Sequence, residues 1–226
     1  MPTKSTQSLL HLLHLASTTL PVGAFSYSEG LETLVQTNQI TQVEQLKHWL
    51  TQDLTYGAIR LEGLALVRAY QATQDQDWAS LGQWNDWLSA VRESYELRQQ
   101  SWMMGRSLAR LLTTVAPEMQ TAIAAGGDPC NFAIAVGLAA AQWQIPRDQA
   151  LLGYLHSWAS TMINAGIKLI PLGQTPGQEL LLSLYPQLED TQRQILDQLD
   201  DPKSCGWGLA IASMTHETLY SRLFRS

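Results

Sequence analysis

The chain has 226 residues, of which 45% are apolar, and this combination indicates a folded protein with a sizeable core and excludes a disordered one. Charged residues make up only 15%, against about 25% in typical domains. The surface therefore carries either neutral polar side chains, such as Gln and Thr, or apolar side chains that a partner covers. The net charge of −6 argues against binding to a phosphate backbone, so no nucleic-acid partner is expected.

The cysteines, the first residues and the apolar runs indicate the cellular compartment in which the protein is expected. Cys130 and Cys205 make neither a disulfide framework nor a Cys-x-x-Cys metal site. The first seven residues lack the regions of a secretion signal, and the longest apolar run, residues 132–141, is too short to span a bilayer. We therefore expect a soluble, cytoplasmic protein that does not contact a membrane.

The first two helices are predicted near the start of the chain. Leucines at helical spacing predict a helix over residues 9–15. Ser26-x-x-Glu29 has the form of a capping box, in which the two side chains accept hydrogen bonds from the first free N–H groups of a helix. It predicts a second helix over residues 27–35.

Three further helices follow. The signature Thr41-x-x-Glu44 predicts the start of a third helix, and the apolar spacing after it extends to about Ala69. Apolar residues three and four positions apart predict the next helix from Trp78 onward. A long helix is then predicted over residues 93–114.

The second half of the chain continues the helical pattern. Residues 126–129, Gly-Gly-Asp-Pro, combine a helix stop with an N-cap candidate and a proline at a first helical position. The run over residues 132–141 is apolar on all sides and predicts a helix within the core. Pro146 opens another helix, and the last two are predicted over residues 178–198 and 201–213.

The fold class follows from these elements. No segment shows sustained alternation with a period of two, so no strand is predicted, and neither repeats nor linkers interrupt the chain. The sequence predicts an all-α fold in which residues 1–226 form a single-domain bundle of about nine or ten helices.

Catalytic motifs are absent from the sequence. It contains neither the phosphate-binding pattern G-x-x-x-x-G-K-[ST] nor the nucleophile pattern G-x-S-x-G. We therefore expect a protein that is not an enzyme. The alternative, an all-α enzyme with a small-molecule or metal pocket between its helices, remains open.

The histidines are weak metal candidates. His11 and His14 are three residues apart and share a helix face, and His216 precedes a glutamate. A metal site would normally need a third and a fourth ligand of suitable type, so structural roles are favoured for all three. No metal site and no permanently bound cofactor is expected.

One predicted helix combines the residue types of protein interfaces. The helix over residues 93–114 carries the side chains of Arg98, Arg106, Arg110, Tyr95, Trp102 and Met103. Arginine, aromatic residues and methionine are enriched at binding hot spots. The alternative is a core stripe with solvated arginine tips.

The chain end is unusually apolar and basic. In residues 221–226, Ser-Arg-Leu-Phe-Arg-Ser, cations alternate with large apolar groups, and no predicted helix supports them. Such an end favours a segment that becomes ordered in a partner's groove. The alternative is that Phe224 folds back onto the protein's own core.

Four blocks of sequence, in family order and spread over the chain, resemble the UreF family of urease accessory proteins. They read LLHLASTTLPVGAFSYSEGLE, ending at Glu32, ELRQQSWMMGRSL at 96–108, IKLIPLGQTPGQ at 167–178 and SMTHETLYSRLFRS at 213–226. The resemblance implies an all-α, non-catalytic chaperone that acts in nickel insertion into apo-urease. It also implies a homodimer that binds UreD, called UreH in some organisms, and then the GTPase UreG. This assembly docks on apo-urease, and GTP hydrolysis is coupled to the delivery of nickel, which passes through the complex.

The resemblance also indicates candidate partner-binding residues. The tail over residues 216–226 is implied to order on binding UreD, through Arg222, Leu223, Phe224 and Arg225. The long helix carries a family motif near the partner-binding and dimer surfaces, represented by Tyr95, Glu96, Arg98 and Arg106. Lys168, or an arginine, is a candidate to reach the GTPase across the interface.

The loop before the second helix is similar to a surface element of the UreF family. Its shape is attributed to Pro21, Gly23, Ser26 and Glu29. A turn does not need Phe25 or Tyr27, so these two aromatic residues are predicted to contact a partner. The alternative is that both pack beneath the loop.

Overall fold

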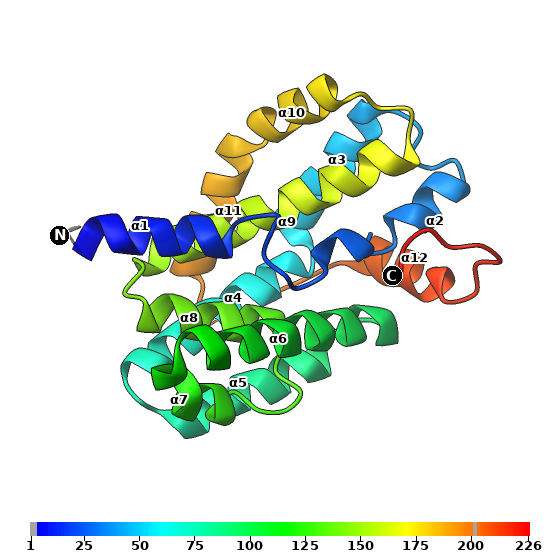
Figure 1. The fold of residues 1–226 in the computed structure, drawn as a ribbon. Helices are drawn as coiled ribbons and strands as arrows, with labels where there is room; N and C mark the ends of the chain where they lie inside the picture. Colours follow the sequence, from blue (N-terminus) through cyan, green and yellow to red (C-terminus); the bar gives the residue numbers. More distant parts are fainter. Residues whose placement is uncertain (1–3, 201–202) are drawn as a thin grey trace.

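The computed structural model describes residues 4–200 and 203–226, and within these ranges the regular structure is helical, without a strand. Twelve α-helices and two 3-10 helices follow one another through these described ranges. Figure 1 shows their arrangement. Their bounds are α1 Lys4–Leu15, η1 Ala24–Ser26, α2 Leu31–Gln36, α3 Val43–Tyr56, α4 Ile59–Gln74, α5 Trp78–Val91, α6 Tyr95–Val115, η2 Pro117–Met119, α7 Gln120–Ala125, α8 Phe132–Gln142, α9 Arg147–Leu169, α10 Gln174–Ser183, α11 Tyr185–Asp197 and α12 Trp207–His216.

The all-α prediction is confirmed, but the predicted count of nine or ten helices is too low. The third predicted helix is divided into α3 and α4 at Gly57, which ends α3 in an extended conformation. The helix predicted over residues 178–198 is likewise two helices, since α11 starts anew with Pro186 in its first turn. The short helix α7 had no periodic signal long enough to predict it. The division of the chain into domains stays a prediction.

The centre of the molecule is α8, which packs against α4, α6 and α9. Every residue over 133–141 is buried, which confirms the prediction that this apolar helix lies in the core. Its small side chains allow close approach. A Cβ on Gly137 would lie 2.4 Å from the carbonyl oxygen of Leu66, so only glycine lets α8 lie this near to α4.

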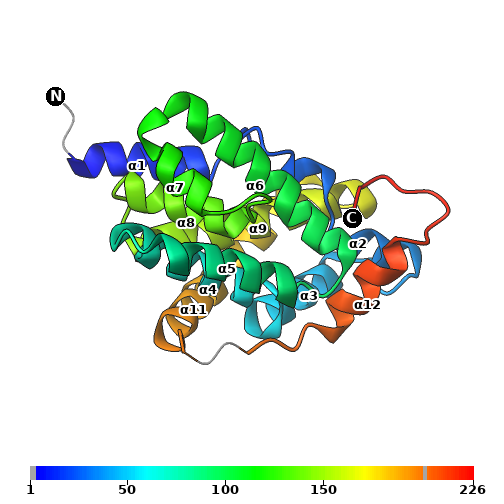
Figure 2. The ribbon, with the colours of Figure 1, turned by 90° about the horizontal axis from the view of Figure 1, so that it is seen from below.

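The other helices surround this centre. In Figure 1, α5 to α8 lie below α4, and α3 and α9 to α11 lie above it. The helix α1 lies at one end of the molecule. At the other end α12 packs on α2 and α6, and the segment after α12 returns to the same end (Figures 1 and 2).

Three helices start later than the sequence signals predict. The helix α3 begins after Gln42, which forms a reciprocal capping box with Gln45, so the box predicted at Thr41 is shifted by one residue. The helix α8 begins after Asn131, later than the Asp-Pro signal suggests. The last helix starts at Trp207, and residues 201–202 of its predicted span lie outside the described residues.

None of the helices in the described part of the chain combines the length and the apolar character that crossing a bilayer requires.

Candidate interaction surfaces

The loop before α2 presents one aromatic ring and buries the other. Pro21 is exposed, and Gly23 has φ +78°, in the left-handed region that favours glycine. The short helix η1 follows and holds Phe25 outward, with 71% of its surface exposed. Tyr27 is only 6% exposed and belongs to the core. Of the two predicted contact residues, Phe25 is therefore available to a partner, whereas Tyr27 packs beneath the loop.

The predicted capping box at Ser26 and Glu29 is wrong. Ser26 ends η1, and the N-cap of α2 is Gly30, whose φ is +79°. Glu29 instead points inward, because its carboxylate accepts hydrogen bonds from Gln100 Nε2 at 2.8 Å and Trp158 Nε1 at 2.9 Å. Glu29 shapes the loop by attaching it to α6 and α9 and not by capping a helix.

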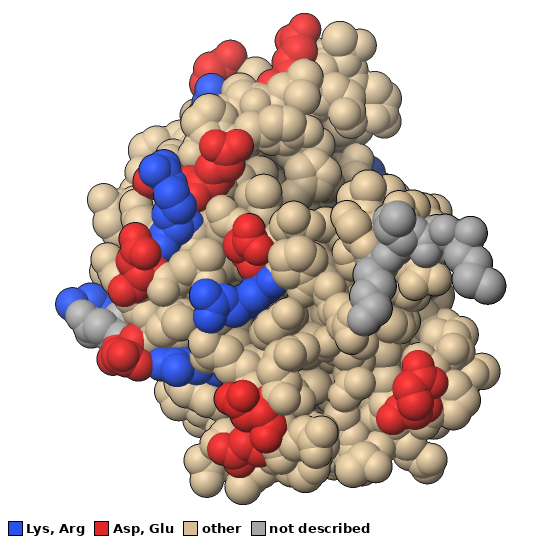
Figure 3. Space-filling model, turned by 90° about the vertical axis from the view of Figure 1, so that its left-hand side faces the viewer, with Lys and Arg blue, Asp and Glu red and all other residues tan. Residues whose placement is uncertain are grey.

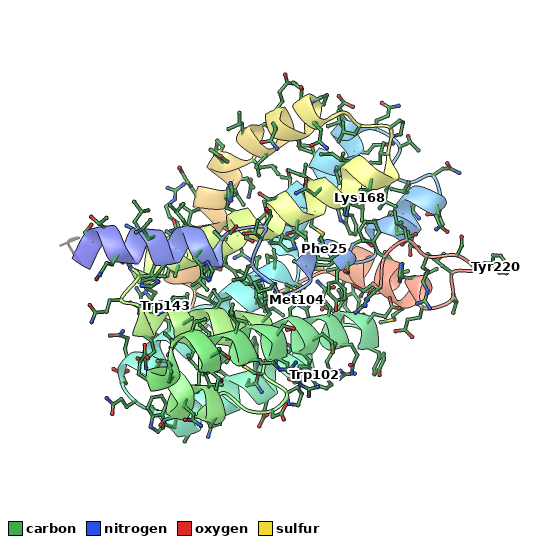
Figure 4. All side chains as sticks on the ribbon, viewed as in Figure 1. Phe25, Trp102, Met104, Trp143, Lys168 and Tyr220 are labelled. Atoms are coloured by element: carbon green, nitrogen blue, oxygen red, sulfur yellow. The ribbon has the colours of Figure 1, made fainter. Side chains whose placement is uncertain are left out.

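Lys168 connects this loop with the chain end. Its Nζ lies 3.5 Å from the carbonyl oxygen of Phe25 and 5.4 Å from the centre of the Phe224 ring. Figure 4 shows Phe25 and Lys168 close to each other, from the loop and from α9. The structure thus brings together three residues that were predicted separately.

The predicted motif of α6 is divided between two places. Tyr95 is exposed at the start of the helix, and Glu96 faces α12 and the chain end. Arg98 lies over the Trp102 ring at 5.8 Å, and Arg106 pairs with Asp128 at 3.1 Å. Arg106 and Arg110 are exposed and Arg98 is half-buried, whereas Glu96 is engaged by His216 and Arg222.

Residues 221–226, which we call the C-terminal segment, lie against α2 and α6. Phe224 is part of the main core, and Ser226 is buried. The N–H of Arg225 donates to the carbonyl oxygen of Ser26 at 2.9 Å. Phe224 therefore folds back onto the protein's own core, as the alternative expectation had it, whereas docking of this segment in a partner's groove stays a prediction. Arg222, Leu223 and Arg225 remain exposed and available to a partner.

An apolar surface on α12 was not predicted. Trp207, Ile211 and Met214 follow at helical spacing and are exposed between 50% and 74%. We call these three residues the α12 face. The opposite side of α12 is buried, so this helix is apolar all round without being enclosed. That pattern is visible in the sequence and is the signal that could have identified the face.

Large apolar side chains are also exposed near the C-terminal segment and on α1. Tyr220, just before the C-terminal segment, is fully exposed and projects away from the body of the molecule (Figure 4). At the opposite end α1 exposes Leu9, Leu10 and Leu13. Figure 3 shows that uncharged atoms cover most of that side, with charged side chains scattered over it, as the low charge content predicts.

The three metal candidates have other partners. His11 stacks on Trp143 at 4.5 Å, and His14 approaches the same ring edge-on at 6.4 Å. Burial, and then the nearby charge of His14, lower the pKa of His11. His216 is fully buried between two carboxylates. The described residues contain no group of three or more His, Cys, Asp or Glu side chains that could hold a metal ion.

A buried polar cluster, also not predicted, lies beneath the loop. Glu62 accepts hydrogen bonds from Arg92 and from the Tyr154 hydroxyl, and Glu29 lies beside them. Burial, and then the charge of Glu62, raise the pKa of Glu29. The cluster lines a cavity of about 100 Å³, which is several times the volume that a water molecule needs. Glu62, Arg92 and Tyr154 are hydrogen-bonded to one another, and Glu29 is bonded to Gln100 and Trp158, as in a structural network. The residues come from four different elements, so no local sequence pattern marks them.

Comparisons with known proteins agree with this structure. The UreF family model matches residues 40–185, more than half of the chain. A protein of a Nostoc species is 58% identical over 218 residues, which covers 96% of this chain and 95% of the relative. A relative in Microcystis aeruginosa is 52% identical over 221 residues, covering 97% and 98%. A more distant one in Alkalilimnicola ehrlichii is 40% identical over 221 residues, covering 95% and 94%. Each of the three is named urease accessory protein UreF, and the chain belongs to the UreF family.

Proposed function

We propose that this chain acts in urease maturation as a non-catalytic accessory chaperone. It binds UreD, called UreH in some organisms, and the resulting complex recruits the GTPase UreG and docks on apo-urease. GTP hydrolysis then drives the insertion of nickel, which passes through the assembled complex. Membership of the UreF family and the names of its relatives support this role.

The observation that carries the docking role is the α12 face. One side of this helix lies in the core, and three large apolar side chains on its other side are exposed to water. Exposing so much apolar surface is unfavourable in free energy unless a partner covers it. Tryptophan and methionine are also the residue types enriched at interfaces. The exposed Leu223 and Arg222 of the C-terminal segment add an apolar and a cationic contact close to it in sequence. We assign this end of the molecule to UreD.

Point substitutions test this assignment better than a truncation. Deleting residues 216–226 would remove the buried His216 and Phe224, and would disturb the fold as well as the surface. The variant Ile211→Ser changes only an exposed side chain. It is expected to keep the free energy of unfolding within about 0.5 kcal/mol and to lose co-purification with UreD. Leu182→Ser, at an equally exposed position on α10, is the matched control and should bind normally.

A normal yield of UreD with the Ile211→Ser chain would refute the docking role of the α12 face. If Ile211→Ser and Leu182→Ser both lost binding to UreD, the loss would be a general effect of removing an exposed aliphatic side chain. That result would also refute the docking role of the α12 face.

Lys168 and Phe25 are proposed to form the contact with UreG. An exposed ammonium next to an exposed aromatic ring combines charge and apolar area in one place. If Lys168 reaches the GTPase, hydrolysis of GTP by UreG should change when the wild-type chain is added and change less with Lys168→Ala. Equal rates with both chains would remove Lys168 from this role. The proposal includes a homodimer, which light scattering of the chain alone tests.

The cavity beneath the loop favours one alternative, an all-α enzyme with a pocket between its helices. Tyr154 and Glu62 would be its reactive groups, because they line the cavity and share a hydrogen bond. Turnover of a small molecule by the purified chain, lost in Tyr154→Phe, would support this alternative. The chaperone proposal expects no turnover by the chain alone.

A further inference from the structure

The last residue of α12, His216, lies between two carboxylates from different helices. Its Nδ1 is 2.7 Å from Oε2 of Glu96 on α6, and its Nε2 is 3.2 Å from Oε2 of Glu32 on α2. A neutral imidazole has only one N–H, so its other nitrogen would face a carboxylate oxygen with a lone pair. With Glu32 and Glu96 as acceptors, both contacts are hydrogen bonds in the imidazolium form, which donates from both nitrogens.

The same two carboxylates also hold the C-terminal segment. The Glu32 carboxylate accepts hydrogen bonds from the backbone N–H groups of Leu223, at 2.7 Å, and Phe224, at 2.9 Å. The second oxygen of Glu96 accepts from Arg222 Nη1 at 3.0 Å. The segment is thus attached to the acceptors that His216 keeps in place.

Charge balance makes His216 necessary to this arrangement. The side chains of Glu32 and Glu96 are almost completely buried, and His216 is entirely buried. Their two negative charges are matched by the imidazolium and by the guanidinium of Arg222, whose side chain is 42% exposed. Without the imidazolium, two buried carboxylates would face each other with one exposed cation, and a buried charge without its partner is strongly unfavourable.

We propose that His216 is a positioning residue: its protonated ring holds Glu32 and Glu96 so that these carboxylates fix the C-terminal segment beside α12. The consequence for binding UreD rests on the proposed function, whereas the attachment of the segment does not. Figure 2 shows the arrangement, with the segment leaving α12 and returning between α2 and α6.

Amide hydrogen exchange of the chain alone tests the attachment. In His216→Phe, which keeps a ring but has no donor, exchange protection of the Leu223 and Phe224 amides should fall about tenfold or more, the factor expected for a lost charge-assisted hydrogen bond. Amides of α8 should keep their protection, because the core is not touched. Glu217→Gln, which neutralises the exposed acid next to His216, is the control and should leave all these amides unchanged.

A second substitution separates positioning from simple packing. In the double variant His216→Phe/Glu96→Gln one of the two facing charges is gone, so the Leu223 and Phe224 amides should regain part of their protection relative to His216→Phe. Glu96→Gln alone keeps the volume of the site and contacts neither amide, but it should still weaken their protection, because Glu96 holds both His216 and Arg222. Unchanged protection in both single variants, or no recovery in the double variant, would overturn the role of His216.

Co-purification of the same variants with UreD distinguishes the two proposals. If His216→Phe releases the segment and UreD still binds normally, the segment is not part of the docking site, although the positioning role stands. If the segment stays protected and UreD binding is lost, the positioning role fails and the docking proposal survives.

Discussion

Two neighbouring residues of the C-terminal segment allow anchoring and partner contact to be separated by experiment. Phe224 is 6% exposed and packs in the main core, whereas Leu223 is 65% exposed. We expect Phe224→Ala to release the segment and Leu223→Ala to leave it in place. Both are expected to weaken binding to UreD, but for different physical reasons.

The magnitude follows from the burial of the ring. Burying a phenylalanine side chain contributes about 1.5–3 kcal/mol, and truncating one in a core costs about 3–5 kcal/mol. The cation–π contact with Lys168 adds about 0.5–1 kcal/mol. Because the segment is short and terminal, it opens locally without unfolding the helices. A loss of about 3 kcal/mol raises the fraction of molecules with an open segment roughly a hundredfold. Leu223→Ala should cost less than about 0.5 kcal/mol.

Limited proteolysis and amide hydrogen exchange of residues 221–226 measure the opening, and chemical denaturation measures global stability. Phe224→Ala should increase cleavage and exchange in the segment while the denaturation midpoint changes little. Leu223→Ala should match the wild-type chain in both. Unchanged amide exchange of the segment in Phe224→Ala would refute the reasoning. A loss of global stability as large as the roughly 3 kcal/mol expected for opening the segment would refute it too, because the segment would then unfold only with the whole molecule.

Four other substitutions test the core and the buried charges. Gly105→Ala should cost about 1–3 kcal/mol in thermal denaturation, since its Cβ would lie 2.1 Å from the carbonyl oxygen of Cys130; a cost near zero would contradict that packing. Arg92→Met should lower the free energy of unfolding by about 3–5 kcal/mol, because it leaves buried glutamates without their cation. Arg106→Ala removes an exposed ion pair and should lower the free energy of unfolding by less than about 1 kcal/mol. Similar losses in the two variants would refute this contrast. Burial, and then nearby glutamate charges, raise the pKa of Asp53 well above its ordinary value, so its contribution to stability falls as pH rises from the ordinary carboxyl range. Asp53→Asn should therefore raise the free energy of unfolding at neutral pH, with the gain vanishing in acid, and a pH-independent effect would argue against a buried, protonated carboxyl group.

Local patterns in the sequence determined the fold class and the position of the core. Apolar side chains at helical spacing fix which segments form helices, and a run that is apolar on all sides, as in residues 132–141, has no face that suits water. The boundaries were less certain where short elements meet. A glycine at position 57 and a proline at position 186 divide predicted helices, and periodicity continues across such breaks because the apolar spacing is the same on both sides.

The candidate site depended on contacts between distant parts of the chain. Ser26-x-x-Glu29 satisfies the capping pattern, yet Glu29 accepts a hydrogen bond from Trp158, 129 residues away. A buried indole N–H needs a protein acceptor, whereas the N–H groups at a helix start in water can bond to the solvent. The attachment of the C-terminal segment through Glu32 and His216 likewise joins residues 184 positions apart. A pattern with a period of a few residues contains no information about such pairings. The sequence alone therefore determined the helices, the core and the family, and only the tertiary structure decided which polar side chains are buried together and which apolar ones remain for a partner.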